Sequence, residues 1–369
     1  MIGKYEAKIM KKIAVIIDSL AGGGAERVML TLAQEMLVQG HTVTFFSLKE
    51  NVDHIVPDGI DVVFPFKGNK GSLRSWFNGH KYAAILSAAI KTVEGQQPFD
   101  LVLVNLLESY RVTHLMNLKN CFYVIHNSFN KELQREKLMG PIKYWYMRKI
   151  IKHMSGKRLI AVSDGVAQEL TTASLYNPSS VTTIYNPFDI DRIKSLSNET
   201  TEQLPFEKYI LHVGRAAKAK RHDVLFAALK LLEPPIKLVC LTGNTKKLRK
   251  LSEKMGVSEQ VILPGFTTNP YPWIKNAELL ALSSDFEGLP TVLIEAIVCG
   301  TKVVSTNCPH GPNEILLDEL SQYLVPPQDP RQLATAINNA LTTNINLSDA
   351  KILGKINVKD VSKLYLALC

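Results

Sequence analysis

The sequence predicts an α/β protein with two Rossmann-like domains that face each other across a cleft. Short apolar runs of strand length alternate with segments of helical periodicity, which is typical of doubly wound parallel sheets. The alternation stops near Asn186 and Pro187 and starts again at Tyr209. A chain of 369 residues is long enough for two domains of ordinary size.

The first predicted domain spans residues 1–187. Residues 12–17 form an apolar run that predicts a buried parallel strand, and residues 25–38 have helical spacing that ends at Gly40. Further strands are expected at residues 41–47, 101–104, 122–125 and 159–162.

The second predicted domain spans residues 207–347 and follows a linker at residues 188–206, whose later part is polar and irregular. Its helices are expected from about residue 223 and at residues 245–255. Its strands are expected at residues 209–213, 236–241, 261–263, 279–282 and 301–305.

The composition is that of a globular protein, with 46% hydrophobic and 21% charged residues. No window holds the roughly 18 uninterrupted apolar residues of a spanning helix, and residues 1–12 do not resemble a secretory signal. The five cysteines are scattered without C-x2-C spacing, which argues against a disulfide framework and a zinc site. We therefore expect a cytoplasmic protein.

A glycine-rich turn, Gly22-Gly23-Gly24, follows the first predicted strand. Glycine lets backbone approach a ligand closely and take positive φ. A dinucleotide-binding fingerprint is the competing hypothesis, but it requires Gly or Ala where the chain has Arg27. The pattern therefore argues against NAD.

The most informative motif runs from residue 285 to 296. It places Glu287 and Glu295 on either side of Pro290, which is favoured in the first turn of a helix, and Gly300 is a stop signal. A helix N-terminus binds phosphate, and a carboxylate can accept from two vicinal hydroxyls. The motif predicts a nucleotide-sugar site, and the alternative is a capped amphipathic helix with two solvated glutamates.

Cations follow another predicted strand. Gly214 and Arg215 come directly after residues 209–213, and Lys220 lies close behind. Arg grips phosphate oxygens with its planar fork and Lys acts as a point charge, so the group suits a pyrophosphate. A solvated basic turn is the alternative.

Two further features sit at strand ends. His126 follows the strand at residues 122–125, where either a functional or a structural hydrogen-bonding role is open. Gly265 and Phe266 follow the strand at residues 261–263 and can present backbone groups to a flat base.

Taken in order, these motifs resemble family 4 of the glycosyltransferases, which are retaining enzymes of the GT-B fold. The resemblance covers about residues 12–340 and rests on Gly22-Gly23-Gly24-Ala25-Glu26-Arg27-Val28, His126-Asn127, Val213-Gly214-Arg215 with Lys220, Pro264-Gly265-Phe266, Phe286-Glu287-Gly288-Leu289-Pro290 with Glu295-Ala296, and Gly311-Pro312-Asn313-Glu314-Ile315-Leu316.

The resemblance implies a role for each matching residue. Glu295 matches the glutamate on the donor ribose, and Glu287 the one on donor-sugar hydroxyls. Arg215 and Lys220 match the pair on the diphosphate, and His126 a histidine near the transferred sugar. The implied catalytic residues are Glu287, Arg215, Lys220 and His126, and the implied donor-binding residues are Gly23, Gly24, Gly214, Gly265, Phe266, Gly288, Leu289, Pro290 and Glu295.

Some features depart from the family pattern or compete with it. Residues 218–221 are more basic than the usual turn, which leaves open which cation binds the diphosphate. Residues 348–369 imply a short C-terminal helix that crosses back towards the first domain. Asp189-Ile190-Asp191 is formally a D-x-D metal motif, but at a domain boundary the acid is expected to cap a helix. No metal or other cofactor is expected.

The net charge of +9 is unevenly spread. Residues 131–158 hold nine Lys or Arg against two Glu, together with three adjacent aromatic residues. Basic residues mixed with interfacial aromatics suit an anionic membrane surface, and a solvated basic helix is the alternative. No nucleic-acid motif accompanies the charge. The expected membrane or acceptor side comprises Lys143, Trp145, Arg148, Lys149 and Lys152.

The expected function is transfer of a hexose or N-acetylhexosamine from a UDP-sugar to a lipid-linked or lipopolysaccharide-type glycan. The enzyme would work at the inner face of the cytoplasmic membrane as a peripheral protein. A UDP-sugar epimerase of similar two-domain fold is one alternative, and a non-catalytic nucleotide- or lipid-binding relic is another.

Overall fold

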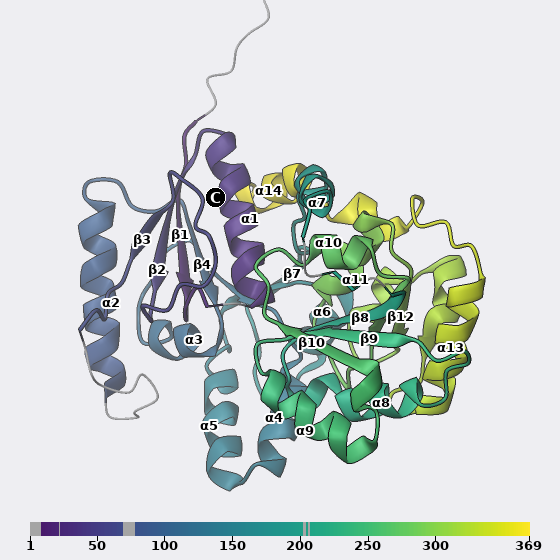
Figure 1. Ribbon diagram of the computed structural model, residues 1–369. Helices are drawn as coiled ribbons and strands as arrows, with labels where there is room; N and C mark the ends of the chain where they lie inside the picture. The colour runs from purple at the N-terminus through teal and green to yellow at the C-terminus, as the bar shows by residue number, and fades with distance from the viewer. Residues whose placement is uncertain (1–8, 22, 69–77, 202–203, 206) are drawn as a thin grey trace, which may run out of the picture. The chain divides into compact units, whose positions relative to one another are not determined.

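The computed structural model describes residues 9–21, 23–68, 78–201, 204–205 and 207–369. Gly22 of the glycine-rich turn lies outside the described residues. The chain divides into two compact units (Figure 1). The first unit comprises Met1–Val162, Ala167–Pro187 and Val358–Cys369, and the second comprises Ser163–Val166 and Phe188–Asn357.

The first unit is built on a parallel sheet in the order β3-β2-β1-β4-β5-β6-β7. Its strands are β1 (Lys12–Ile17), β2 (Thr42–Ser47), β3 (Asp61–Val63), β4 (Leu101–Asn105), β5 (Cys121–Ile125), β6 (Arg158–Ala161) and β7 (Ser180–Thr183). Its helices are α1 (Gly24–Val38), α2 (Gly79–Glu94), α3 (Leu107–Thr113), α4 (Phe129–Leu138), α5 (Pro141–Lys152), α14 (Val358–Leu366) and most of α6 (Asp164–Thr172).

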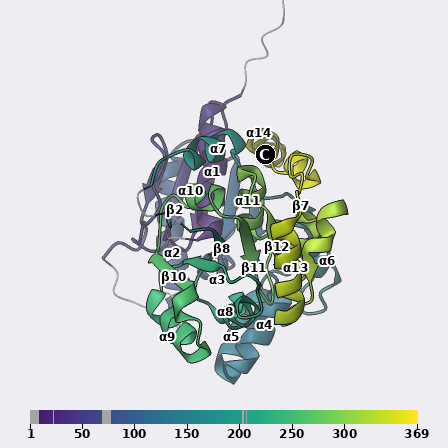
Figure 2. The same ribbon diagram turned by 45° about the vertical axis from the view of Figure 1, so that its right-hand side comes forward.

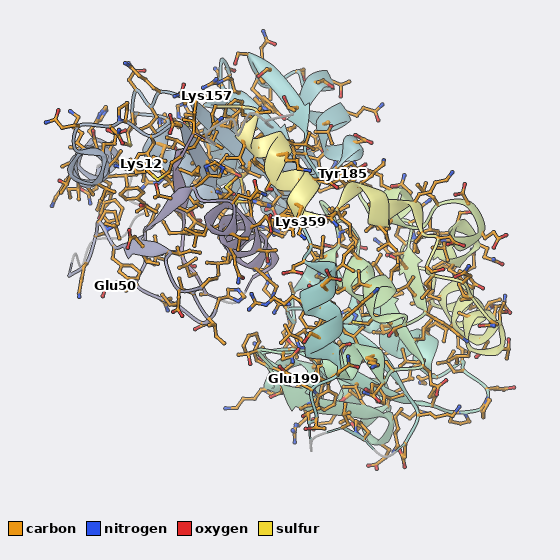
Figure 3. All side chains as sticks on the ribbon, turned by 90° about the horizontal axis from the view of Figure 1, so that it is seen from above. Lys12, Glu50, Lys157, Tyr185, Glu199 and Lys359 are labelled. Atoms are coloured by element: carbon orange, nitrogen blue, oxygen red, sulfur yellow. The ribbon has the colours of Figure 1, made fainter. Side chains whose placement is uncertain are left out.

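The apolar run at residues 12–17 is explained by the position of β1 at the centre of this sheet. β1 pairs in parallel with β2 on one side and β4 on the other, and its residues from Ile13 to Ile17 are buried. Lys12, labelled in Figure 3, is the first residue of β1 and fixes the start of this strand by two hydrogen bonds. Its backbone N–H donates to Asp100 at 2.7 Å, and its ammonium donates to the carbonyl of Val93. A strand with neighbours on both sides and helices on both faces needs continuous apolar sequence.

Helices cover both faces of the first sheet. Figure 1 shows α1 and α2 on opposite sides of the sheet, with α14 beside α1. The first strand and the last helix lie in the same unit, and hydrogen bonds join this helix to residues next to β1 and α1. The Lys11 ammonium donates to the Leu366 carbonyl at 2.7 Å, and the Gln39 side chain, at the end of α1, donates to Ser362.

The second unit has a parallel sheet in the order β10-β9-β8-β11-β12-β13. Its strands are β8 (Tyr209–Val213), β9 (Lys237–Leu241), β10 (Val261–Gly265), β11 (Leu279–Leu282), β12 (Val303–Thr306) and β13 (Leu324–Val325). Of these, β8, β10, β11 and β12 are labelled in Figure 2. Its helices are α7 (Ile190–Ser197), α8 (His222–Leu229), α9 (Thr245–Met255), α10 (Tyr271–Lys275), α11 (Thr291–Cys299), α12 (Pro312–Ile315) and α13 (Pro330–Thr342), with short 3₁₀ turns at Lys218–Lys220, Ser258–Gln260, Asp318–Tyr323 and Lys351–Lys355.

The doubly wound α/β architecture predicted for both halves is confirmed. Residues 188–206 differ from the expected linker, because α7 forms within them and packs on α10 and α11 of the second unit. Asp189 caps this helix by accepting from the Arg192 N–H at 3.0 Å, which confirms capping as the role of the D-x-D segment. The short strands β3, β7 and β13 were not predicted from the sequence.

Each sheet reverses its strand order once. The reversal lies between β1 and β4 in the first unit and between β8 and β11 in the second. Ligands of open α/β sheets bind outside the carboxyl ends of the strands at such switch points. The residues that follow these four strands are therefore where binding chemistry is expected.

Candidate functional site

At the switch point of the second unit, a cation and a carboxylate from different strands meet. Lys220 lies in the connection after β8 and Glu287 in the loop after β11. The Lys220 ammonium lies 2.7 Å from Glu287 Oε1, and the two side chains are only 20% and 12% exposed. Two residues that were predicted to act on the donor are thus brought together at the place where the fold expects a ligand.

The loop after β8 keeps this pair in place. Gly214 lies against the Lys220 stem, because a Cβ at that position would stand 3.5 Å from Lys220 Cε. The Ser283 hydroxyl, from the end of β11, donates to the Lys220 carbonyl at 2.8 Å. The Asp285 N–H donates to the carbonyl of Ala219. The loops after β8 and β11 are therefore joined by hydrogen bonds from backbone as well as side-chain groups.

The other cations of this loop differ in what they contact. Arg221 donates to both Asp223 and Asp285, at 2.8 and 3.1 Å, and these carboxylates raise the pKa of its guanidinium. Arg215 is exposed and has no ion-pair partner among the described residues. Arg221 thus binds two carboxylates of this region, whereas Lys220 is paired with Glu287.

The glutamate motif forms the predicted turn into a helix. α11 begins at Thr291, with Pro290 as the residue before it, and Gly300 ends it with φ of 77°. Pro290 was expected inside the first turn, and it instead occupies the cap position. Glu295 is buried within α11, one turn beyond the helix start.

The segment Gly288-Leu289-Pro290 is buried and held by two neighbours. The Ser163 hydroxyl donates to the Gly288 carbonyl at 3.2 Å. Gly311, with φ of 88°, leaves no room for a side chain, since a Cβ would stand 2.7 Å from the Gly288 oxygen and 2.6 Å from Pro290. This glycine is required by both its backbone conformation and its contact with the segment.

Gly265 and Phe266 lie at the end of β10, as predicted. Gly265 has φ of 109°, a conformation that favours glycine. Phe266 is 55% exposed. A large aromatic ring left in solvent beside strand ends can stack on a flat base.

Two buried histidines lie beneath the cation loop. His212 in β8 and His222 at the start of α8 pack edge to face with ring centroids 4.7 Å apart. His212 Nδ1 donates to the Ala281 carbonyl at 3.0 Å. Burial lowers the pKa of His212 to about 4 and that of His222 to about 2, so both rings are neutral at pH 7.

In the first unit, the glycine turn leads directly into α1. Gly23 has extended backbone, with φ of −140°, and Gly24 is the first helical residue. The expectation of positive φ does not apply to Gly23. Its lack of a side chain matters for packing instead, because a Cβ there would stand 2.2 Å from the Glu26 carboxylate. His54 Nε2 lies 3.2 Å from the Gly23 N and O atoms and holds the turn.

His126 lies at the carboxyl end of β5, with Nε2 2.9 Å from Asn105 Oδ1 at the end of β4. Burial lowers its pKa to about 4. Asp18, which follows β1, accepts from the backbone N–H groups of Glu108 and Ser109 at the start of α3, and burial raises its pKa to about 6. Polar residues thus gather at the first switch point, in a different unit from the Lys220–Glu287 pair.

The basic segment forms the helix pair α4 and α5. On α5, Met147, Ile150 and Ile151 are buried, so this face packs inward. The other face leaves apolar side chains in solvent, including Ile142 at 82% and Trp145 at 62% exposure. Leu138, the last residue of α4, and Met139, which follows it, are also exposed. The predicted residues Lys143, Lys149 and Lys152 are exposed around them, and Arg148 stacks over the Trp145 ring at 5.8 Å.

Several residues of these sites were not found from the sequence. Asn105 and Ser163 act through contacts with residues distant along the chain, which no local pattern reveals, whereas Gly311 belongs to a motif that carried the family resemblance. Glu314 belongs to the last motif that carried the resemblance, and its carboxylate accepts from the N–H groups of Asp164 and Gly165, each at 2.8 Å.

The described residues contain neither a metal-binding cluster nor a helix that could span a membrane. No set of three or more His, Cys, Asp and Glu side chains is arranged to hold a metal ion. No helix combines the length and the apolar character needed to cross a bilayer.

Two family models match the chain. The model described as Glycosyltransferase Family 4 matches residues 22–192, and the one described as Glycosyl transferases group 1 matches residues 197–359. Together they cover both units and all the predicted site residues.

Individual proteins are similar to most or to about half of the chain. The N-acetylgalactosamine-N,N'-diacetylbacillosaminyl-diphospho-undecaprenol 4-alpha-N-acetylgalactosaminyltransferase of Campylobacter jejuni is 25% identical, over 97% of this chain and 98% of that protein. Lipopolysaccharide 1,6-galactosyltransferase of Escherichia coli is 26% identical over 56% of this chain and 58% of that protein.

Among solved structures, Anabaena Alr3699/HepE in complex with UDP-glucose superposes with a TM-score of 0.75 at 19% identity, covering 97% of this chain and 98% of that one. A sucrose-phosphate synthase from Thermosynechococcus elongatus superposes with a TM-score of 0.72 at 19% identity, over 97% of this chain and 96% of that one. The motifs, the two parallel-sheet units and both family models agree: the chain belongs to glycosyltransferase family 4 and has the GT-B fold.

Proposed function

We propose that the protein is a retaining, metal-independent glycosyltransferase that moves a hexose or N-acetylhexosamine from a UDP-sugar to a lipid-linked or lipopolysaccharide-type glycan. The observation that carries this proposal is the meeting of Lys220 and Glu287 at the second switch point, where the same connection after β8 also holds Arg215, which has no ion-pair partner in the described part of the chain. A cation pair and a carboxylate at one place match the two ends of an activated sugar, its diphosphate and its hydroxyls.

Donor binding would replace the contact between Lys220 and Glu287 with two contacts to the ligand. The Lys220 ammonium would turn to the diphosphate, together with Arg215 and the N-terminus of α11. The freed Glu287 carboxylate would accept from sugar hydroxyls. Glu295 would accept from the ribose hydroxyls, and Phe266 would stack on the base.

The reaction breaks the bond between the anomeric carbon and UDP, and negative charge grows on the departing diphosphate. Arg215 and Lys220 stabilise that charge directly, which is the part a bound metal plays in other transferases. We therefore expect full activity in the presence of EDTA. Strict dependence on a divalent cation would contradict this assignment.

Retention follows if the acceptor attacks from the face that UDP leaves. We assign no protein base to this step, because the departing phosphate oxygen can take the acceptor proton. The anomeric configuration of the product, read from its proton NMR coupling, tests it. An inverted product would show that a different mechanism operates.

The names of the relatives support a cell-surface glycan as acceptor. One acts on a diphospho-undecaprenol glycan and another on lipopolysaccharide. Exposed apolar side chains at the end of α4 and on α5 lie in the same segment as several exposed lysines. This combination suits binding to an anionic membrane that carries such an acceptor. We propose that the protein works as a peripheral enzyme at the inner membrane face.

UDP release measured with and without a lipid-linked glycan acceptor tests the function directly. A glycosyltransferase releases UDP only slowly until the acceptor is added. An epimerase would convert the UDP-sugar without any acceptor, and a non-catalytic relic would bind the donor without turnover. The membership of both halves in glycosyltransferase families favours transfer.

A further inference from the structure

His126 is held by one hydrogen bond in the described part of the chain. Its Nε2 lies 2.9 Å from Oδ1 of Asn105. Asn105 is itself fully buried at the end of β4, beside the switch point of the first sheet. The direction of this hydrogen bond decides what the other ring nitrogen can do.

The amide of Asn105 can face only one way. Its Nδ2 lies 3.1 Å from the Leu103 carbonyl of its own strand and 3.5 Å from the Ile16 carbonyl of β1. Carbonyl oxygens accept and cannot donate, so the NH₂ group must face them. The amide oxygen therefore faces His126, and Nε2 of the ring must carry the proton that it donates.

The second ring nitrogen is consequently an acceptor. A neutral imidazole with its proton on Nε2 has a lone pair on Nδ1. The ring is partly exposed, and Nδ1 is neither buried nor bonded to any described residue. Burial is the cause of the lowered pKa of His126, and no charged side chain contributes to the shift. The neutral form is thus the one present at pH 7.

We infer that Asn105 is a positioning residue, which holds His126 in its Nε2–H tautomer so that Nδ1 accepts a hydrogen bond from a hydroxyl of the bound sugar. This inference rests on the proposed function for the identity of the ligand. A lone pair on Nδ1 can recognise a hydroxyl but repels phosphate or carboxylate oxygens. His126 would therefore contact the neutral glycosyl part of the donor or acceptor.

The tautomer of the wild-type protein is the first test, since it needs no catalysis. In protein labelled with ¹⁵N-histidine, the His126 signals are identified by their absence from the His126→Gln variant. At pH 7 we expect a proton on Nε2 and none on Nδ1. A proton on Nδ1 overturns the inference.

The second test is Asn105→Asp, which keeps the shape of the side chain and its acceptor. A carboxylate beside the ring favours the imidazolium, so the pKa of His126 should rise by at least about one unit. Because the imidazolium carries a proton on Nδ1, kcat/KM at one pH unit below the new pKa should fall about tenfold, while the wild type falls by no more than about twofold there. His126→Asn, whose amide oxygen can take the place of Nδ1, should retain more activity than His126→Leu.

A matched control is Asn186→Asp, which puts a carboxylate at another buried asparagine that has no contact with His126 in the described structure. The pKa of His126 should not change in this variant. An unchanged pKa in Asn105→Asp, or an equal rise in both variants, contradicts the inference. If the spectra behave as expected but the wild type transfers no sugar from any UDP-sugar, the proposed function fails and the tautomer assignment stands.

Discussion

The Lys220 ammonium and the Glu287 carboxylate lie 2.7 Å apart although 67 residues separate them in the chain. β8 and β11 are neighbours in the sheet, so the loops that follow them meet at one edge. Without a donor, each charge has the other as its partner. This ion pair compensates the charge of both largely buried side chains. A bound donor could replace it with contacts of its own to each side chain.

Replacing Lys220 with Met should lower kcat about 100-fold, because one of the charges that stabilise the departing diphosphate is lost. Steady-state kinetics with the UDP-sugar donor measure this. Lys218→Met is the matched control, since Lys218 is exposed in the same turn. It should stay within about threefold of wild type. Equal losses in both variants would mean that the turn acts only through its overall charge.

Replacing Gly311 with Ala should weaken binding of the UDP-sugar at least about tenfold. Its Cβ would meet the Gly288 oxygen and Pro290, and the backbone at φ of 88° disfavours any side chain, so the segment before α11 must shift. Gly354→Ala is the control, because nothing lies within 4 Å of a Cβ there. Calorimetric titration with UDP compares the two. Unchanged affinity in Gly311→Ala would show that this segment does not shape the site.

The free energy of unfolding should fall as the pH drops from 7.5 to 5. The pKa of His212 is about 4 in the folded protein against 6.5 for the free side chain, so the unfolded chain binds the extra proton first in this range. One such histidine contributes a loss of about 2 kcal/mol. Asp18, with its pKa raised to about 6, acts in the opposite direction, but His114, His126 and His222 act as His212 does.

The variant His212→Asn isolates this effect, since an amide can still donate to the Ala281 carbonyl. Urea unfolding at pH 7.5 and 5 should show a pH dependence smaller than that of wild type by about 2 kcal/mol. If the difference between the two pH values is the same in both proteins, His212 is not neutral when folded.

Changing Lys143, Lys149 and Lys152 to Gln should reduce binding to vesicles that contain anionic lipid, more strongly at low salt. Ile142→Ser with Trp145→Ser should reduce binding at all salt concentrations, because these exposed side chains would enter the lipid. Vesicle sedimentation measures both.

The control for that experiment lies on α9, where Lys246, Lys250 and Lys254 are also exposed. Changing these three to Gln removes the same charge from another helix. Equal effects of the two triple variants would point to net charge and not to the α4–α5 surface.

The spacing of apolar residues and the positions of glycine and proline were enough to predict most of the fold. β1 and β8 were found at their observed bounds because central parallel strands are continuous apolar runs. α9 was also found at its observed bounds, and the structure ends it at Gly256 in a left-handed conformation. β3 and β13 were missed because edge strands of two or three residues carry no measurable pattern. The cap of α7 at Asp189 was predicted, but the extent of this helix was not, because its polar face resembles a loop and its other face packs on α10 and α11.

Site residues could be predicted from the sequence where they come shortly after a strand along the chain. Arg215, Glu287 and His126 each come shortly after a strand, so the sheet topology brings them to its carboxyl edge. Sequence left open which cation of residues 218–221 binds the diphosphate, since the choice depends on Asp223 and Asp285 binding Arg221. Asn105 was missed for the same reason, because its role exists only through a partner on the next strand.

The central claim is that the second unit holds a uridine nucleotide by a carboxylate on its ribose. Calorimetric titration of UDP into wild type and Glu295→Ala tests this most directly, with exposed Glu253→Ala on α9 as the control. We predict that wild type and Glu253→Ala bind UDP equally and that Glu295→Ala binds it about 10- to 100-fold more weakly. Equal affinity in all three proteins, or no binding of UDP by wild type, would contradict the account.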